Sequence, residues 1–131
     1  MDVQRIVGYL DTLGLTYEDV GDNTWVVQDE DKGLQNVVVV YEDPIVIIRV
    51  KVTEVPLEGK CAFFEELLRL NASEMVHGAY GLDGDSIIVL NTLVSQTMDL
   101  EELQASLDSI SLSVAQHYQV LSKFVPHRKE T

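Results

Sequence analysis

Histidine and cysteine are the residues of this sequence that could most directly carry out chemistry. Acid–base catalysis near neutral pH most often uses histidine, and the chain contains His77, His117 and His127. They fall at the start of an expected strand, inside an expected helix where the spacing requires an apolar residue, and in a polar tail. We therefore predict that His117 is a packed or interfacial histidine. Cys61 lies at the start of an expected helix, where a thiol can be activated, although an inert small residue is the simpler interpretation.

Two short motifs resemble ligand-binding loops but lack residues that such loops require. Asp29–Gly33 begins with alternating carboxylates, as a calcium-binding EF-hand loop does, but Leu34 occupies the position of the required glycine. Gly81–Asp85 is rich in glycine, but neither the lysine nor the helix of a phosphate-binding loop follows it. With a single cysteine there is no internal disulfide and no Cys/His cluster for zinc. The sequence predicts no cofactor, no metal, no catalytic residues and no enzyme activity.

The charge balance excludes several classes of partner. Nine Lys and Arg against 22 Asp and Glu give a formal net charge of -13, which repels phosphate backbones and anionic lipids. No apolar run approaches the roughly 20 residues of a membrane helix, and the N-terminus lacks the pattern of a signal peptide. We expect no nucleic-acid partner, no membrane partner and a cytoplasmic location. The length of 131 residues favours a single domain over 1–131, with a polar tail from about residue 127.

Hydrophobic periodicity predicts an α+β fold in the order α-β-β-β(-β)-α-β-β-α. Helices are expected at Asp2–Leu13, Lys60–Asn71 and Asp99–Val125, the last starting with a capping box of Asp99 and Glu102. Alternation and β-branched residues predict strands at Leu15–Val20, Thr24–Gln28, Asn36–Glu42, Ile45–Val55, His77–Leu82 and Ser86–Leu93. We expect an antiparallel sheet of about five or six strands with three helices.

The two strands around Asp43-Pro44 are apolar on both faces. Val37–Val40 and Ile45–Ile48 each contain four consecutive apolar residues, so one face belongs to the core and the other requires cover from a helix or a second molecule. The predicted partner-binding surface consists of Trp25, Val38, Val40, Ile45 and Ile47. The chain is also predicted to form a homodimer, and the candidate interface residues are Phe63, Leu67, Ile45 and Ile47.

The order of elements, together with several short motifs, resembles the type III secretion chaperone-like fold. The motifs are Leu67-Leu68-Arg69-Leu70-Asn71, Gly78-Ala79-Tyr80-Gly81-Leu82-Asp83-Gly84-Asp85, Ile88-Val89-Leu90 and Leu100-Glu101-Glu102-Leu103. They look like the helix-hairpin-helix half of the Tir chaperone (CesT) family and its YbjN-like relatives. By topology the resemblance covers nearly the whole chain, and by motif about a third.

The resemblance implies a non-enzymatic polypeptide-binding module. Secretion chaperones of this kind are ATP-independent homodimers that hold an extended segment of an effector, and the YbjN-like branch consists of regulators. The expected partners are a second copy of the chain and a protein client or regulatory partner. The alternative is a small-ligand-sensing regulatory domain, with a cavity between the long helix and the sheet lined by Trp25, Tyr80 or His117.

Overall fold

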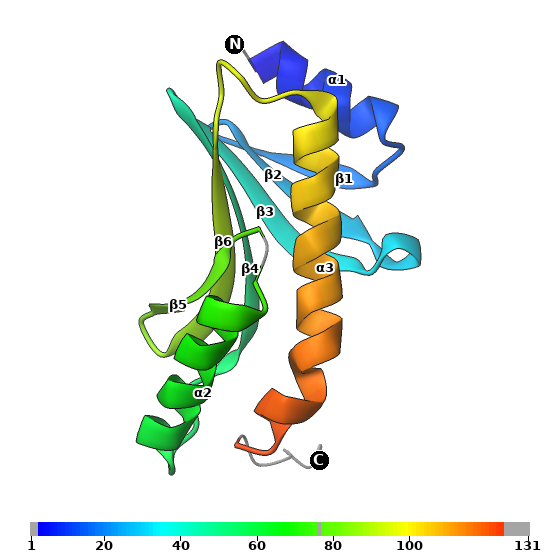
Figure 1. Ribbon diagram of the computed structural model, residues 1–131. Helices are drawn as coiled ribbons and strands as arrows, with labels where there is room; N and C mark the ends of the chain where they lie inside the picture. Colours follow the sequence, from blue (N-terminus) through cyan, green and yellow to red (C-terminus); the bar gives the residue numbers. More distant parts are fainter. Residues whose placement is uncertain (1–2, 76, 125–131) are drawn as a thin grey trace.

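The computed structural model describes residues 3–75 and 77–124, and within them the chain has an α+β fold (Figure 1). The α-helices are α1 (Val3–Thr12), α2 (Lys60–Ser73) and α3 (Leu100–Ser122). The strands are β1 (Tyr17–Gly21), β2 (Thr24–Asp29), β3 (Leu34–Glu42), β4 (Ile45–Glu54), β5 (Ala79–Asp83) and β6 (Ser86–Val94), with a 3-10 turn η1 (Glu30–Lys32) between β2 and β3. The predicted helices and strands are confirmed to within a few residues at each end. The predicted end of the last helix at Val125 and the predicted tail lie outside the described residues.

The six strands form one antiparallel sheet in the order β1-β2-β3-β4-β6-β5. The first four strands lie side by side in the sheet in the order of the sequence, because short turns connect each strand to the next. The chain then leaves the sheet through α2 and returns as a hairpin, of which β6 and not β5 pairs with β4. The free edges of the sheet are therefore β1 and β5, and β4 lies near its middle.

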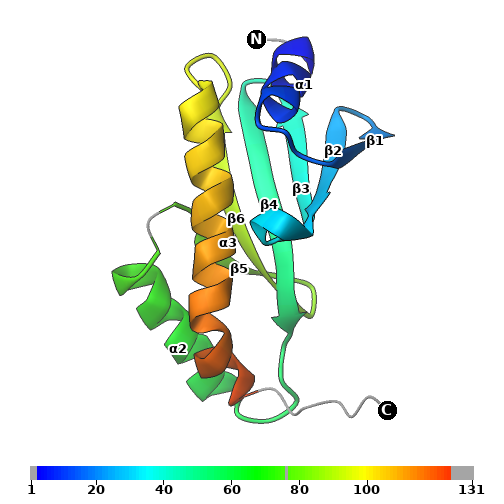
Figure 2. The ribbon, with the colours of Figure 1, turned by 90° about the vertical axis from the view of Figure 1, so that its right-hand side faces the viewer.

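All three helices cover the same face of the sheet (Figures 1 and 2). Their apolar stripes join the inward side chains of the strands in one core. Fully buried members include Ile6 from α1, Phe63 from α2, Leu103 from α3 and Ile48 from β4. None of the described helices is both long and apolar enough to cross a membrane.

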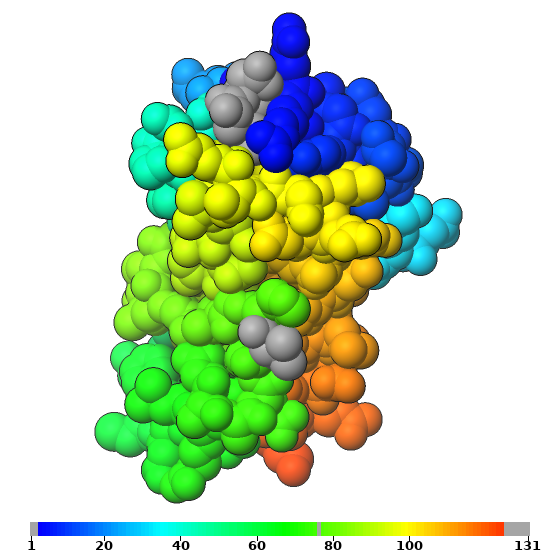
Figure 3. All heavy atoms as spheres, turned by 45° about the horizontal axis from the view of Figure 1, so that its top comes forward, coloured from blue at the N-terminus to red at the C-terminus, as the bar shows by residue number. Residues whose placement is uncertain are grey.

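The long helix α3 begins as the sequence predicts and continues without a break. The Asp99 side chain accepts a hydrogen bond from the Glu102 backbone N–H at 2.8 Å, and the Glu102 carboxylate accepts one from the Asp99 backbone N–H at 3.1 Å. This reciprocal pair satisfies two donors that a helix start would otherwise leave unpaired. Near this end Arg5 of α1 donates a hydrogen bond to the Met98 carbonyl oxygen at 2.8 Å. Figure 3 shows α1 in blue against this yellow part of the chain.

The acidic stretch Asp29–Gly33 folds as a turn that is attached to α3. Glu30–Lys32 forms η1, which ends at Gly33 with a left-handed backbone at φ 73°. The Ser111 hydroxyl of α3 donates a hydrogen bond to the Gly33 carbonyl oxygen at 3.0 Å. No set of three His, Cys, Asp or Glu in the described chain is placed to hold a metal ion.

Candidate functional site

The face of the sheet that the helices leave uncovered, the open face, carries a broad apolar surface. Successive residues of a strand point to opposite faces, and paired residues of neighbouring strands share a face. Val40 pairs with Ile47, which pairs with Thr92, and all three belong to the open face. The apolar residues of this face, named here the open-face patch, are Val26, Val38, Val40, Ile45, Ile47, Ala79, Ile88, Leu90 and Val94. The predicted surface residues Val38, Val40, Ile45 and Ile47 thus lie together on the adjacent strands β3 and β4, and all four are half-buried.

Trp25 does not belong to this surface, and that part of the prediction is wrong. Trp25 pairs with Val39, which pairs with Ile48, and Ile48 pairs with Asn91. The Asn91 amide donates a hydrogen bond to the Ser106 hydroxyl of α3 at 2.8 Å, so this row faces the helices. Trp25 is accordingly 1% exposed and is a core residue.

Phe63 and Leu67 are core residues too, and as described they are not available to an interface. Phe63 is fully buried, with its ring centroid 5.5 Å from that of Phe124, and Leu67 is 6% exposed. They lie on the stripe of α2 that faces the sheet and α3. The large apolar residue that α2 exposes is the neighbouring Leu68, at 67% exposure. The helix itself remains a candidate interface, but through a different stripe.

Ion pairs mark one end of the open face. Arg49 of β4 pairs with Asp83 of β5, so its side chain spans the intervening strand β6. Lys51, two residues after Arg49 on the same face, pairs with Glu54. Both ion pairs are exposed and contribute little to stability. They mark the point on β4 where the apolar residues of the open face end and charged residues begin. The outer face of β4 therefore starts apolar, at Ile45 and Ile47, and ends charged, at Arg49 and Lys51.

The two histidines that the structure describes, His77 and His117, have different surroundings. His117 is 5% exposed, and its Nδ1 lies 2.7 Å from the Tyr80 hydroxyl, while its Nε2 is buried with no hydrogen-bond partner in the described structure. Burial raises the pKa of Tyr80 to about 12. His77 lies before β5, and His127 lies outside the described residues. His117 is therefore packed, as the sequence predicts. The Cys61 thiol is free and exposed at the start of α2.

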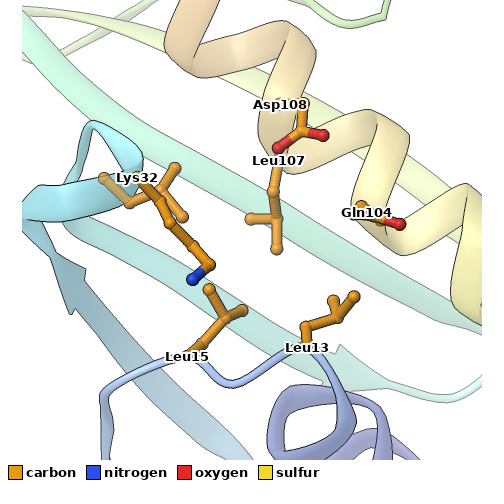
Figure 4. A pocket seen from close by; sticks show the side chains of 7 residues that line it. Leu13, Leu15, Lys32, Gln104, Leu107 and Asp108 are labelled. Carbon is orange, nitrogen blue, oxygen red and sulfur yellow. The ribbon is translucent and has the colours of Figure 1, made fainter.

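A small pocket lies on the helix-covered side, between the end of α1, η1 and α3 (Figure 4). Its volume is about 30 Å³, far below the roughly 300–1,000 Å³ of sites that enclose cofactors. Tyr80, His117 and Trp25, proposed above as cavity residues, are not among its lining residues. Tyr80 and His117 are packed against each other, with ring centroids 5.8 Å apart.

Three solved structures share this fold over most of their length. YbjN from E. coli, a proposed transcription regulator, has a TM-score of 0.67 and 17% identity, with 92% of this chain and 93% of that chain covered. A chain of the ExoU–SpcU heterodimeric complex from the type III secretion system of Pseudomonas aeruginosa has a TM-score of 0.70 and 16% identity, with 90% and 95% covered. A chain of the HopA1–SchA chaperone–effector complex has a TM-score of 0.62 and 8% identity, with 86% and 89% covered.

The fold is therefore that of type III secretion chaperones, as the sequence motifs indicate. None of the curated proteins is similar enough in sequence to match this chain. The profile of the CesT_Tir_1 family, however, matches residues 1–127, which is nearly the full length. This is a family of secretion chaperones and not of enzymes. The chain belongs to the CesT/Tir chaperone family.

Proposed function

We propose that this chain is a non-enzymatic module that holds an extended polypeptide segment on its open face. The observation that carries this proposal is the open-face patch itself, because an apolar surface of this extent on a sheet that helices cover on one side only requires a partner. Val40 and Ile47 lie at its centre and pair with each other across β3 and β4. Apolar contact at such a centre supplies most of the binding energy, and the polar rim supplies selectivity.

Client binding of this kind needs no nucleotide. We expect a half-exposed surface to bind its client with modest affinity. Binding and release of the client are then the two directions of one equilibrium. The free edges at β1 and β5 offer backbone donors and acceptors to which an extended client can add a strand. The net charge of -13 keeps an apolar surface in solution and favours basic clients. A cytoplasmic location is part of this proposal.

The homodimer is also a proposal, and its interface is best supported at the outer stripe of α2. Leu68 is exposed on this helix, Leu57 is exposed in the segment before it, and Leu82 is exposed on β5. Asn71 of α2 exchanges two hydrogen bonds with the backbone of Tyr80, which places β5 along the helix. An interface there leaves Ile45 and Ile47 free for the client. Sedimentation at about 50 μM should give a dimer for the parent and a monomer for Leu68→Glu; a monomeric parent contradicts the proposal.

The decisive experiment compares client binding by two variants that each replace an aliphatic residue by aspartate, Ile47→Asp on the open face and Leu112→Asp on α3. The parent, Ile47→Asp and the control Leu112→Asp are used for affinity capture in the native cell, and the retained polypeptide is identified. Leu112 is exposed on α3, so its variant has the same added charge on the opposite side of the sheet. A synthetic segment of that polypeptide should then bind Ile47→Asp at least about tenfold more weakly than the parent and the control.

Circular dichroism separates loss of binding from loss of fold. If Ile47→Asp stays folded and binds the segment as the parent does, the open face is not the binding site. If the parent retains no polypeptide but does retain a metabolite, the small-ligand-sensing regulatory function replaces this one. The similarity of the fold to YbjN is the observation that favours that second candidate.

A further inference from the structure

The two free edges of the sheet differ in how many backbone groups they leave for a further strand. At β5, the Asn71 side chain accepts a hydrogen bond from the Tyr80 backbone N–H at 2.8 Å and donates one to the Tyr80 carbonyl oxygen at 3.2 Å. The backbone groups of Tyr80 thus point away from β6 and are already bound. Gly78, two residues before, has a φ of 95°, so the extended backbone does not continue there. Among the residues of β5, alternation leaves Leu82 with an outward pair that Asn71 does not bind.

At the other edge, the outward backbone groups belong to two residues of β1. The Gln28 backbone N–H donates a hydrogen bond to the Thr16 carbonyl oxygen at 2.9 Å, so Thr16 faces β2. Alternation along the strand then turns the backbone groups of Tyr17 and Asp19 away from β2. Figure 2 shows β1 at the margin of the sheet, with no helix or strand of the described chain beyond it. Residues Glu18–Gly21 are all exposed, so this edge is accessible to an extended segment.

The charge around β1 is strongly negative. Five carboxylates lie in this strand, in the turn after it, or in hydrogen-bond contact with Thr16 or Tyr17 at its start: Asp11, Glu18, Asp19, Asp22 and Asp29. From residue 11 to residue 31 the chain contains seven acidic residues and no basic one. The hydrogen bond to Asp11, burial and the charges of Asp11 and Asp19 raise the pKa of the Tyr17 hydroxyl. Such a field attracts a basic segment and repels an acidic one.

We infer that a basic, extended polypeptide segment adds to the sheet at β1, and that Asn71 closes β5 to it. The inference rests on the proposed polypeptide-binding function and names the edge and the charge of the bound segment. Hydrogen bonds to the backbone of Tyr17 and Asp19 hold the segment, and lysine or arginine side chains beside the carboxylates provide selectivity. Asn71 is then a specificity-determining residue, because it occupies the groups of an edge that would otherwise accept a strand.

The probe is a nine-residue peptide that alternates three lysines with two valines between glycine–serine ends. One control peptide carries an N-methyl group on each central residue, which removes the backbone donors but keeps the charge; the other replaces the lysines by glutamates. At about 5 mM peptide and a Kd of about 1 mM, hydrogen exchange of the Tyr17 and Asp19 amides in the full chain should slow about sixfold. A control peptide that binds at least about tenfold more weakly should slow it about 1.5-fold or less.

A charge-reversal variant places the peptide beside β1. Glu18→Lys should weaken binding of the lysine–valine peptide at least about threefold, because it sets a like charge against the lysines. Glu58→Lys makes the same change of charge at an exposed residue before α2 and should leave binding unchanged.

An alanine variant tests the closure of β5. In the free chain the Tyr80 amide should exchange at least about tenfold more slowly than the outward amides of β1, because Asn71 binds it. Asn71→Ala should speed the exchange of the Tyr80 amide at least about threefold, whereas Ser73→Ala, an exposed residue on the same helix, should not. A Tyr80 amide that exchanges as fast as those of β1 in the parent, or no more rapidly in Asn71→Ala, refutes the closure.

The docking at β1 is overturned if the lysine–valine peptide protects Leu82 in place of Tyr17 and Asp19, or protects neither strand. Equal binding of either control peptide, or equal weakening in Glu18→Lys and Glu58→Lys, has the same consequence. If the captured client segment still binds the parent more tightly than Ile47→Asp, the proposed function stands without this edge. If that segment binds the parent and Ile47→Asp alike, the proposed function fails as well.

Discussion

Replacing Tyr80 by phenylalanine removes the one hydrogen-bond partner that the described residues give to the buried side chain of His117. The Tyr80 hydroxyl lies 2.7 Å from His117 Nδ1, and the two residues are 6% and 5% exposed. Asn71 binds the Tyr80 backbone through two hydrogen bonds, at 2.8 and 3.2 Å, so the ring of Tyr80→Phe stays in place. The variant therefore tests the side-chain hydrogen bond with little change in packing.

The cost follows from the groups that the variant leaves unpaired. His117 Nε2 already has no partner, so Tyr80→Phe leaves both ring nitrogens buried without a hydrogen bond. An unsatisfied buried polar group costs about 1–3 kcal/mol, and we expect a loss of about 2 kcal/mol in the free energy of unfolding. The double variant Tyr80→Phe with His117→Leu removes every polar atom of the pair. Its stability should lie within about 1 kcal/mol of the parent, because an apolar replacement of both partners is close to neutral.

Urea unfolding measures these differences directly. Fluorescence of Trp25, a buried residue and the only tryptophan, and far-ultraviolet circular dichroism report the transition. The midpoint should fall in Tyr80→Phe and recover in the double variant, with an unchanged slope. A loss below about 0.5 kcal/mol in the single variant, or a double variant as unstable as the sum of the two single ones, would refute the reasoning.

Three further predictions concern stability. Because burial raises the pKa of folded Tyr80 to about 12 from the ordinary 10, the folded chain retains a proton that the unfolded chain loses above pH 10. The contribution of Tyr80 to the free energy of unfolding should be constant below pH 10 and fall by about 2 kcal/mol as the pH rises to about 12. In an alkaline titration Tyr80→Phe should therefore lose less stability over this pH range than the parent. Asp99→Ala breaks the capping box with Glu102 and should cost about 1 kcal/mol in urea unfolding, whereas an uncapped start would make it neutral. Gly33→Ala places a Cβ 2.6 Å from the Ser111 hydroxyl at a positive φ, and should lower the melting temperature by several degrees, or roughly 1–2 kcal/mol; an unchanged melting temperature would contradict this.

Local sequence signals were sufficient for most of the fold. The capping box at Asp99 and Glu102 depends on four consecutive residues, and its position was predictable for that reason. The strands around Asp43-Pro44 have a period of two, so their existence and their turn were also predictable. The same period assigns Val40 and Ile47 to different faces from Val39 and Ile48 without structural information.

The candidate site was only partly predictable, because alternation separates two faces without saying which one is buried. Val38, Val40, Ile45 and Ile47 were correctly grouped, since they follow one period on adjacent strands. Trp25 was placed with them wrongly, because the register of β2 on β3 puts it opposite Val39. On α2, Phe63 and Leu68 are both apolar, and no local signal distinguishes the stripe that packs in the core from the one that faces solvent.

By itself the sequence determined the order of the elements, their approximate bounds, the strong acidity and the lack of a converging catalytic motif, since each depends on composition or on neighbours a few residues apart. Only the tertiary structure decided that all three helices cover one face, that β6 rather than β5 pairs with β4, and that His117 meets Tyr80 across 37 positions. These features depend on contacts between distant segments, which short-range periodicity does not specify. The open-face patch exists for that reason: its residues are apolar by sequence, and they are uncovered because the helices pack on the other side.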